Sequence, residues 1–270
     1  MTGRWLELAD GVFARRHAEL DLTVGLVLGA ERALAIDTRG DETQGAELAG
    51  AVREVTGLPL SVVITHAHFD HCFGTAGFLD AAGGPGPVYA QRGCAGRLRD
   101  TAEEQRAHWT RYYRQRGDRE TAAALADARV VLPDSPVDQA AEVDLGGRVA
   151  RLLHPGPGHT DHDLTVHLPD VNLLFAGDLV EEGAPPAFED AYPLRWPDAL
   201  DTLLSLRPEL VVPGHGDPVP TAFVAGQRAE LITLAELCRA VAAGGLTRAD
   251  AEAISPYPAA TTRAALARVG

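Results

Sequence analysis

The segment 60–74, LSVVITHAHFDHCFG, constrains this chain more than any other. Its first six residues are almost continuously apolar, which is typical of a short strand buried on both faces. The next residues place His66, His68, Asp70 and His71 within six positions. Functional loops of layered α/β folds often lie at the carboxyl ends of such strands. This cluster is therefore either half of a metal site or a chance polar group at a strand end.

The rest of the chain alternates short strands with helices. We predict strands over 5–9, 11–17, 23–30, 32–38, 60–65, 87–91, 148–154, 164–169, 172–177 and 209–214. We predict helices over 42–56, 196–206 and 221–243, two shorter helices after those, and a helical pair over 93–128 that Gly117 interrupts. Since no linker divides the two βα-rich halves, we expect a single layered α/β domain over 1–270, with a helical insertion at about 93–128 and C-terminal helices at about 221–270.

Composition limits the classes of function. With 46% hydrophobic and 23% charged residues and no apolar run of 18, we expect no transmembrane helix. The start, MTGRWLELADGVFARR, lacks a long apolar segment, so we expect no signal peptide and a cytoplasmic protein. The formal charge of −14 predicts neither a nucleic-acid nor a membrane partner. All 24 basic residues are arginine, which excludes Schiff-base catalysis by lysine. The three cysteines are far apart and predict reduced, buried thiols.

Three later segments, each after a predicted strand, carry the same kinds of side chain as the first cluster. HPGPGHTDHD supplies His159, LLFAGDLV supplies Asp178 and LVVPGHGDP supplies His215. Glycines flank each of these residues and let the backbone turn tightly. Imidazole nitrogens and carboxylate oxygens suit zinc, and also iron or manganese. The recurrence of such donors at successive strand ends therefore favours a metal site over a chance cluster.

The spacing within the first cluster suggests two metal centres. His66 and His68 are two positions apart on an extended segment, so their side chains face the same way. Asp70 and His71 can then serve a second centre. Two divalent ions roughly 3.5–4 Å apart would share a bridging water and a bridging carboxylate. Asp178 is the candidate for that carboxylate.

The motifs THAHFDH, GPGHT, FAGDL and VVPGHG, in this order, resemble those of the metallo-β-lactamase superfamily. The resemblance implies an αββα four-layer sandwich with the metals at one edge. It implies that the first metal is bound by His66, His68 and His159, the second by Asp70, His71 and His215, and both by Asp178.

Departures from the family pattern narrow the branch. Zinc β-lactamases have cysteine or serine where this chain has Asp178, so the chain looks like the branch of glyoxalase II, lactonases and thioesterases. Lactonases often have a tyrosine soon after the bridging aspartate, whereas Glu181 and Glu182 stand here and Tyr192 is further on. The basic residues with which glyoxalase II binds glutathione have no residue-by-residue match in this chain.

The resemblance implies a dinuclear metal-dependent hydrolase, with two divalent ions, zinc before iron or manganese. A metal-bridging hydroxide would attack a thioester, ester or lactone carbonyl, and catalytic Asp70 would orient that hydroxide or relay a proton to the leaving group. Three alternatives stay open: a mononuclear iron oxygenase of the persulfide type, a weak β-lactamase, and a non-catalytic ligand-binding protein on the same fold.

Substrate contacts are expected from two segments that follow the metal motifs. Between Gln91 and Glu120 the helical insertion has eight arginines against five acids. It is either a lid that binds an acyl chain or an anionic handle of a small-molecule substrate, or a solvated helical pair whose aromatic residues pack on the sandwich, or a homodimer contact. The second segment is the loop 181–199 after Asp178. The candidate substrate-binding residues are Trp109, Tyr112 and Tyr113 of the insertion, and Phe188 and Tyr192 of this loop.

Two polar residues beside His159 have two interpretations. His162 and Asp163 either orient His159 or cap a turn before the following strand.

Overall fold

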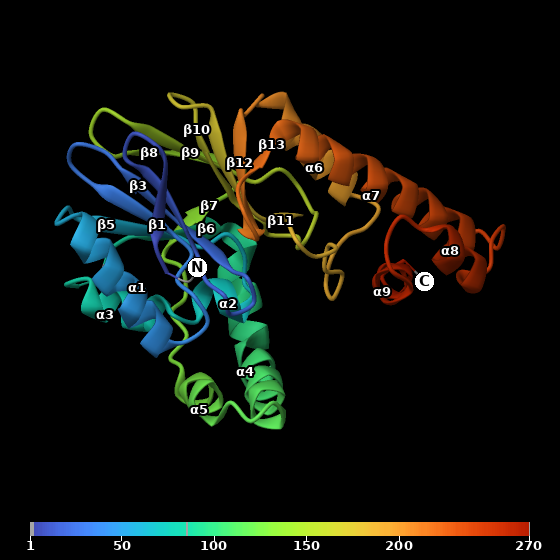
Figure 1. Ribbon diagram of the computed structural model, residues 1–270, viewed down its shortest axis with the longest axis horizontal. Coiled ribbons are helices and arrows are strands. Elements are labelled where there is room, and N and C mark those ends of the chain that lie inside the picture. Colours follow the sequence, from blue (N-terminus) through green and yellow to red (C-terminus); the bar gives the residue numbers. More distant parts are fainter. Residues whose placement is uncertain (1–2, 85, 270) are drawn as a thin grey trace. The chain divides into compact units, whose positions relative to one another are not determined.

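The computed structural model describes residues 3–84 and 86–269, and the chain divides into two compact units, Met1–Leu152 and Leu153–Gly270. In Figure 1 the first unit runs from blue to green and the second from yellow to red. Each unit has its own strands, helices and apolar core. The single domain over 1–270 stays a prediction.

The first unit contains a seven-stranded sheet whose strands follow the order of the sequence, β1-β2-β3-β4-β5-β6-β7. The strands are β1 (Trp5–Ala9), β2 (Val12–Arg16), β3 (Thr23–Leu28), β4 (Ala33–Ile36), β5 (Leu60–Val63), β6 (Val88–Gln91) and β7 (Ser135–Val137). β1 to β4 are antiparallel neighbours joined by short turns, and β4 to β7 are parallel. Parallel neighbours need a crossover, and helices supply each of these connections.

The crossover helices of the first unit are α1 (Glu42–Val55), α2 (Phe69–Cys72), α3 (Thr75–Ala81), α4 (Arg92–Gln115) and α5 (Arg119–Asp127). Asp41 caps the start of α1, and its carboxylate accepts a hydrogen bond from the Gln44 backbone nitrogen at 2.9 Å. Leu48 and Val52 of α1 are buried against the sheet, four positions apart on one face. Two further strands, β8 (Ala140–Asp144) and β9 (Val149–Leu153), follow β7.

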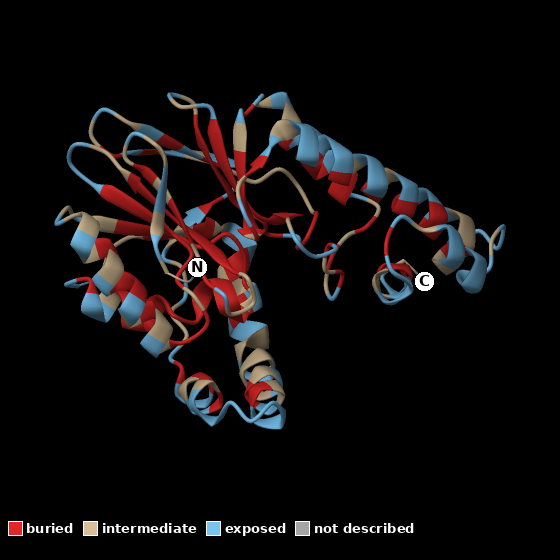
Figure 2. Cartoon of the chain, in the orientation of Figure 1, coloured by how far each residue is buried: buried red, intermediate tan, exposed pale blue. Residues whose placement is uncertain are grey.

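In the second unit the strands lie in the order β13-β12-β11-β10. They are β10 (Thr165–Leu168), β11 (Leu173–Glu181), β12 (Leu210–His215) and β13 (Val219–Pro220), and β11 pairs with β12 in parallel. The helices are α6 (Trp196–Ser205), α7 (Thr221–Ala242), α8 (Arg248–Ile254) and α9 (Ala259–Ala267). Figure 2 shows a buried stripe along α7, to which Leu231 and Leu234 belong, opposite an exposed face.

Most elements predicted from hydrophobic periodicity are present at the expected places, including the break at Gly117 between α4 and α5. The short elements α2, α3, β7, β8 and β13 were not predicted, because they are too brief to give a periodic signal. The predicted end of a strand at residue 177 is wrong, since β11 continues to Glu181. The three cysteines are free and buried, as expected. No described helix is long and apolar enough to cross a membrane.

The contact between α1 and α3 depends on glycines that leave no room for a side chain. A Cβ atom on Gly45 of α1 would lie 1.9 Å from the carbonyl oxygen of Gly74, and one on Gly77 of α3 would lie 2.0 Å from that of Glu42. Backbone therefore packs on backbone at this crossing. The contact matters for the metal motif because α2, which carries Asp70 and His71, ends two residues before Gly74.

We expect Gly45→Ala to lower the free energy of unfolding by about 2 kcal/mol or more, because the added methyl group must push α1 away from α3. The matched control is Gly50→Ala on the same helix, where a Cβ would meet nothing within 4 Å. That substitution should raise stability by roughly 0.5–1 kcal/mol, since alanine favours helix. Urea denaturation of both variants measures the difference, and equal stabilities would contradict the packing argument.

Candidate metal centre

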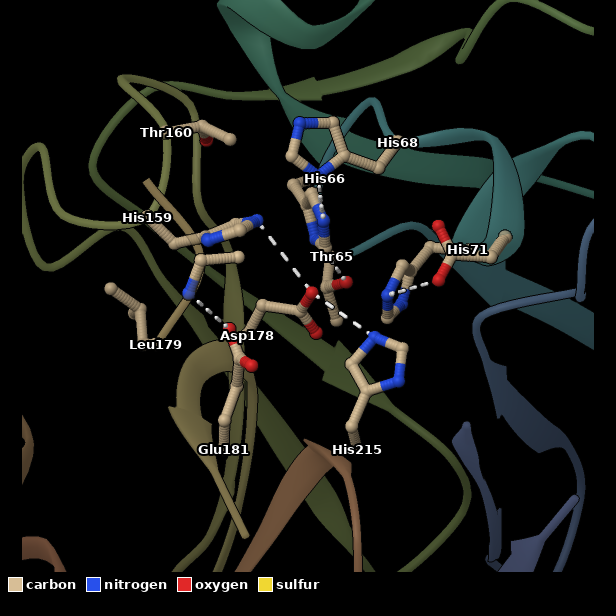
Figure 3. A network of polar contacts seen from close by, with 12 residues as sticks. Thr65, His66, His68, His71, His159, Thr160, Asp178, Leu179, Glu181 and His215 are labelled. Carbon is tan, nitrogen blue, oxygen red and sulfur yellow. Dashed lines mark hydrogen bonds and ion pairs between the residues drawn. The ribbon is translucent and has the colours of Figure 1, made fainter. Parts of the chain in front are cut away.

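Four donor residues of the first unit follow β5. His66 and His68 have ring centroids 4.5 Å apart, and the Nε2 atom of His66 lies 3.0 Å from Nδ1 of His68. The two side chains therefore face the same way, as their spacing predicts. Asp70 and His71 lie on α2, with Asp70 Oδ2 3.6 Å from His71 Nε2. Figure 3 shows His66, His68 and His71 as sticks.

Asp37, directly after β4, holds this group in place. Its Oδ2 atom lies 2.8 Å from His71 Nδ1 and also accepts a hydrogen bond from the Thr65 hydroxyl, while Oδ1 accepts one from the Thr65 backbone nitrogen. The Thr65 hydroxyl in turn lies 3.1 Å from His66 Nδ1. A carboxylate at Nδ1 of His71 favours the tautomer that leaves Nε2 with a lone pair for a cation.

Sequence analysis missed Asp37, although one signal was available. The residue is an acid at the end of the buried strand segment ALAI, where a charge is expensive unless it has partners. Its φ of 63° lies in the left-handed region, which aspartate tolerates better than most residues. The side chain is 2% exposed, so its hydrogen bonds offset the loss of hydration.

Helix α4 also braces the segment that carries the donors. The Gln105 side chain accepts a hydrogen bond from the Phe69 backbone nitrogen and donates one to the Ala67 carbonyl, both at 2.9 Å. One turn later the Trp109 ring stacks on Phe69 with the centroids 4.3 Å apart. The helical insertion is therefore a support for the metal motif, a role that sequence analysis did not predict.

Three donor residues belong to the second unit. Asp178 Oδ2 lies 3.6 Å from His159 Nε2 and 3.2 Å from His215 Nε2. The side chains of His159, Asp178 and His215 are only 2%, 6% and 15% exposed. One buried carboxylate oxygen thus faces two imidazole nitrogens, a donor set that suits zinc, iron or manganese. The residues fit a bound cation.

The sequence suggested that Asp178 lies in a turn after a strand, and this prediction is wrong. Asp178 lies inside β11, where the register with β12 shifts on both sides of Gly177 before Glu181 pairs with His215. Gly214 allows the two strands to meet there, because a Cβ on it would lie 1.8 Å from Asp178 Oδ1.

Burial, and next the charge of Asp178, raise the pKa of the nearby Glu181 well above its usual range. Its Oε1 atom accepts a hydrogen bond from the Ala187 backbone nitrogen at 3.1 Å.

The polar residues after His159 form a turn. The Asp163 carboxylate accepts hydrogen bonds from the Thr160 backbone nitrogen and hydroxyl, which supports the turn-capping interpretation. His162 Nδ1 lies 2.7 Å from Asp161 Oδ1, and this contact is the main reason that the pKa of Asp161 is lowered to about 2. The hydroxyl of Tyr192 donates to the other oxygen of Asp161 at 3.1 Å.

The predicted substrate contacts have packing roles of their own. Trp109 and Tyr112 are half-buried against the first core, and Tyr113 is buried in it. Phe188 is 2% exposed and lies against Trp196, with ring centroids 5.3 Å apart. Their contact with a substrate, like that of Tyr192, stays a prediction.

All seven predicted ligands are donor residues that could hold a metal ion. The first unit supplies four and the second three: His66, His68, Asp70 and His71, and then His159, Asp178 and His215.

Residues 22–215 match the family model described as the metallo-beta-lactamase superfamily. The chain belongs to this superfamily. A metallo-beta-lactamase type 2 from Bacillus cereus is 26% identical over 220 residues, which cover 79% of this chain and 73% of the relative.

Two solved structures show the fold of this superfamily member. The metallo-beta-lactamase from Pontibacter korlensis aligns with a TM-score of 0.67 and 21% identity, covering 86% of this chain and 99% of its own. The inverting sec-alkylsulfatase Pisa1 from Pseudomonas sp. aligns with a TM-score of 0.77 and 18% identity over 98% of this chain. These likenesses confirm the predicted αββα sandwich class. Some matches are partial: the chain spans 36% of another metallo-beta-lactamase type 2 and 50% of the alkylsulfatase.

We expect Asp37→Asn to weaken zinc binding by roughly tenfold to a hundredfold, because the amide cannot hold His71 and Thr65 as the carboxylate does. Asparagine also tolerates a positive φ, so the backbone should keep its conformation. Zinc titration against a chelator measures the change. The control is Asp21→Asn, another aspartate with positive φ, whose carboxylate bonds Arg16 instead. Equal affinities for the Asp37 variant and the unmodified protein would exclude the orienting role.

Proposed function

We propose that this chain is a dinuclear metal-dependent hydrolase that acts on a thioester, ester or lactone carbonyl. The observation that carries the proposal is the buried Asp178 carboxylate, whose Oδ2 atom faces the Nε2 atoms of both His159 and His215. Imidazole and carboxylate groups are common ligands of divalent cations, so a carboxylate oxygen between two imidazole nitrogens suits a ligand shared by two cations. Membership of the superfamily supports the joint use of this set and the four donors of the first unit.

In this proposal all seven donor residues bind a cation. His66, His68 and His159 hold one cation, Asp70, His71 and His215 hold the other, and Asp178 contacts both. Bound divalent cations, zinc first, would supply Lewis acidity and lower the pKa of water toward 7. Asp37 and Thr65 keep the imidazoles of His71 and His66 in the orientation that binding needs.

The remaining proton transfer falls to Asp70. Its side chain lies in the first turn of α2 and is 13% exposed, which leaves it accessible to a substrate. We assign to it the transfer to the leaving group of the proton that the attacking water loses, which leaves the carboxylate ionised again. Thiolates and alkoxides need less assistance than amines, which favours thioesters, esters and lactones over amides.

A second candidate substrate class is sulfate esters. The likeness to the sec-alkylsulfatase extends over 98% of this chain, whereas the likeness to the Pontibacter korlensis β-lactamase extends over 86%. The shared fold suggests this class as a second one to test, and the same cations would serve the hydrolysis of a sulfate ester. Sulfate esters therefore belong in any test of activity.

We expect zinc-loaded protein to hydrolyse one class from a panel of thioesters, lactones, β-lactams and alkyl sulfates. Asp178→Ala should lower kcat/KM for that class at least a hundredfold and remove at least one metal, since a shared ligand is lost. The control is Glu236→Ala, an exposed acid on α7. Initial rates and metal analysis of the same samples are the readout.

The outcomes separate the candidate functions. Turnover of a thioester or lactone supports the first proposal, and turnover of an alkyl sulfate alone supports the second. Oxygen consumption with a persulfide by iron-loaded protein would favour the oxygenase. An Asp178→Ala variant with full metal content and full rate would contradict the bridging role.

A further inference from the structure

Helix α4 carries a stripe of side chains that begins at the metal motif and ends in an exposed cation. Gln105, Trp109, Tyr112 and Arg116 follow one another at spacings of four, three and four, so they share one face of the helix. At 1.5 Å per residue the stripe is roughly 16 Å long. Figure 1 shows α4 leading from β6 to α5.

Neighbouring members of this stripe touch one another. The Gln105 side chain forms hydrogen bonds with the backbone of Ala67 and Phe69. Phe69 is the residue between His68 and Asp70 in the metal motif. Trp109 stacks on Phe69, and the Trp109 and Tyr112 centroids are 4.9 Å apart. The Arg116 guanidinium carbon lies 3.5 Å from the centroid of the Tyr112 ring. Trp109 and Tyr112 are half-buried and Arg116 is exposed.

The end of the stripe has an excess of positive charge. Arg116 and its exposed neighbours Arg111, Arg114 and Arg119 form no ion pair within the described part of the chain. Other arginines of the same helix are paired with carboxylates, as Arg92 is with Asp138 and Arg106 with Glu103. An unneutralised group of four arginines is unusual in a protein with a formal charge of −14. With the exposed Asp118 and Glu120 in the same segment, the group keeps an excess of positive charge that attracts anions.

We propose that this stripe binds the handle of the hydrolase substrate. The substrate is an acyl thioester or ester, and the handle is the part of its leaving group that carries an anion. The apolar part of the handle lies on Trp109 and Tyr112, and a phosphate or carboxylate group pairs with Arg116, roughly 16 Å from Gln105 at the motif. A guanidinium on an aromatic face keeps its donors directed outward to such a group. This inference rests on the proposed function, because it names the substrate class of the same site.

The test compares Arg116→Gln with Arg99→Gln, which removes an exposed arginine of α4 outside the group of four. Three thioesters with the same acyl group are used: butyryl-coenzyme A with a phosphate handle, S-butyrylglutathione with a carboxylate handle, and neutral S-butyryl-N-acetylcysteamine. Arg116→Gln should lower kcat/KM about tenfold for a charged substrate, through KM, because one charge-assisted hydrogen bond is lost. The neutral substrate should change less than about twofold, and Arg99→Gln should affect all three alike.

The charged substrate that loses most identifies the handle as phosphate or carboxylate. Equal losses for the charged and neutral substrates, or equal effects of the two substitutions, would overturn the inference.

A binding measurement separates this inference from the proposed function. Calorimetry with free coenzyme A and with glutathione, on protein without added metal, requires no hydrolysis. We expect one of them to bind the unmodified protein and the Arg99→Gln variant, and to bind Arg116→Gln about tenfold more weakly. If no thioester is hydrolysed yet this pattern appears, the proposed function fails and the anion site stands. If neither thiol binds, or if Arg116→Gln instead dissociates a dimer, the handle site is wrong.

Discussion

The metal motif of the first unit depends on the hydrogen bonds of one buried carboxylate, that of Asp37. Removing such a charge from water is expensive, and only a full set of hydrogen bonds makes it tolerable. Here the partners are the backbone and hydroxyl of Thr65 and the ring of His71, which connect the end of β4 to the end of β5 and to α2. The requirement to satisfy one carboxylate thus fixes three segments of chain, and with them the directions of two imidazole rings.

The sequence predicts those features that depend on local pattern. Buried strands and amphipathic helices follow from the spacing of apolar residues, and the seven donors are recognisable because histidine and aspartate recur after apolar strands. Asp37 and Gln105 escape such reasoning, since their partners are 28 to 38 positions away in the chain. Asp178 was recognised as a ligand but assigned to a turn, because only its pairing with β12 extends β11 past Gly177.

The glycines of the metal motifs are required for two different reasons, backbone conformation and space. Gly216 has a φ of 97°, so it supplies the turn that the sequence suggested after β12. Gly214 has no such backbone requirement and is needed for space, because a Cβ there would overlap the Asp178 carboxylate. Gly158 is similar, since its Cβ would lie 2.4 Å from the Leu179 side chain. Two of these three glycines therefore let a neighbouring strand approach, and conformational preference alone does not reveal that role.

The irregular part of β11 needs support from outside the sheet. Where the register shifts, the strand cannot satisfy every backbone group through its ladder. The Leu179 carbonyl accepts hydrogen bonds from Trp196 Nε1 of α6 at 3.1 Å and from Gln227 Nε2 of α7 at 2.9 Å. The Trp196 ring also lies 5.6 Å from the ring of His159. Two helices that carry no metal ligand thus hold the backbone beside Asp178. Each unit therefore uses a helical glutamine, Gln105 or Gln227, to satisfy the backbone next to its donors.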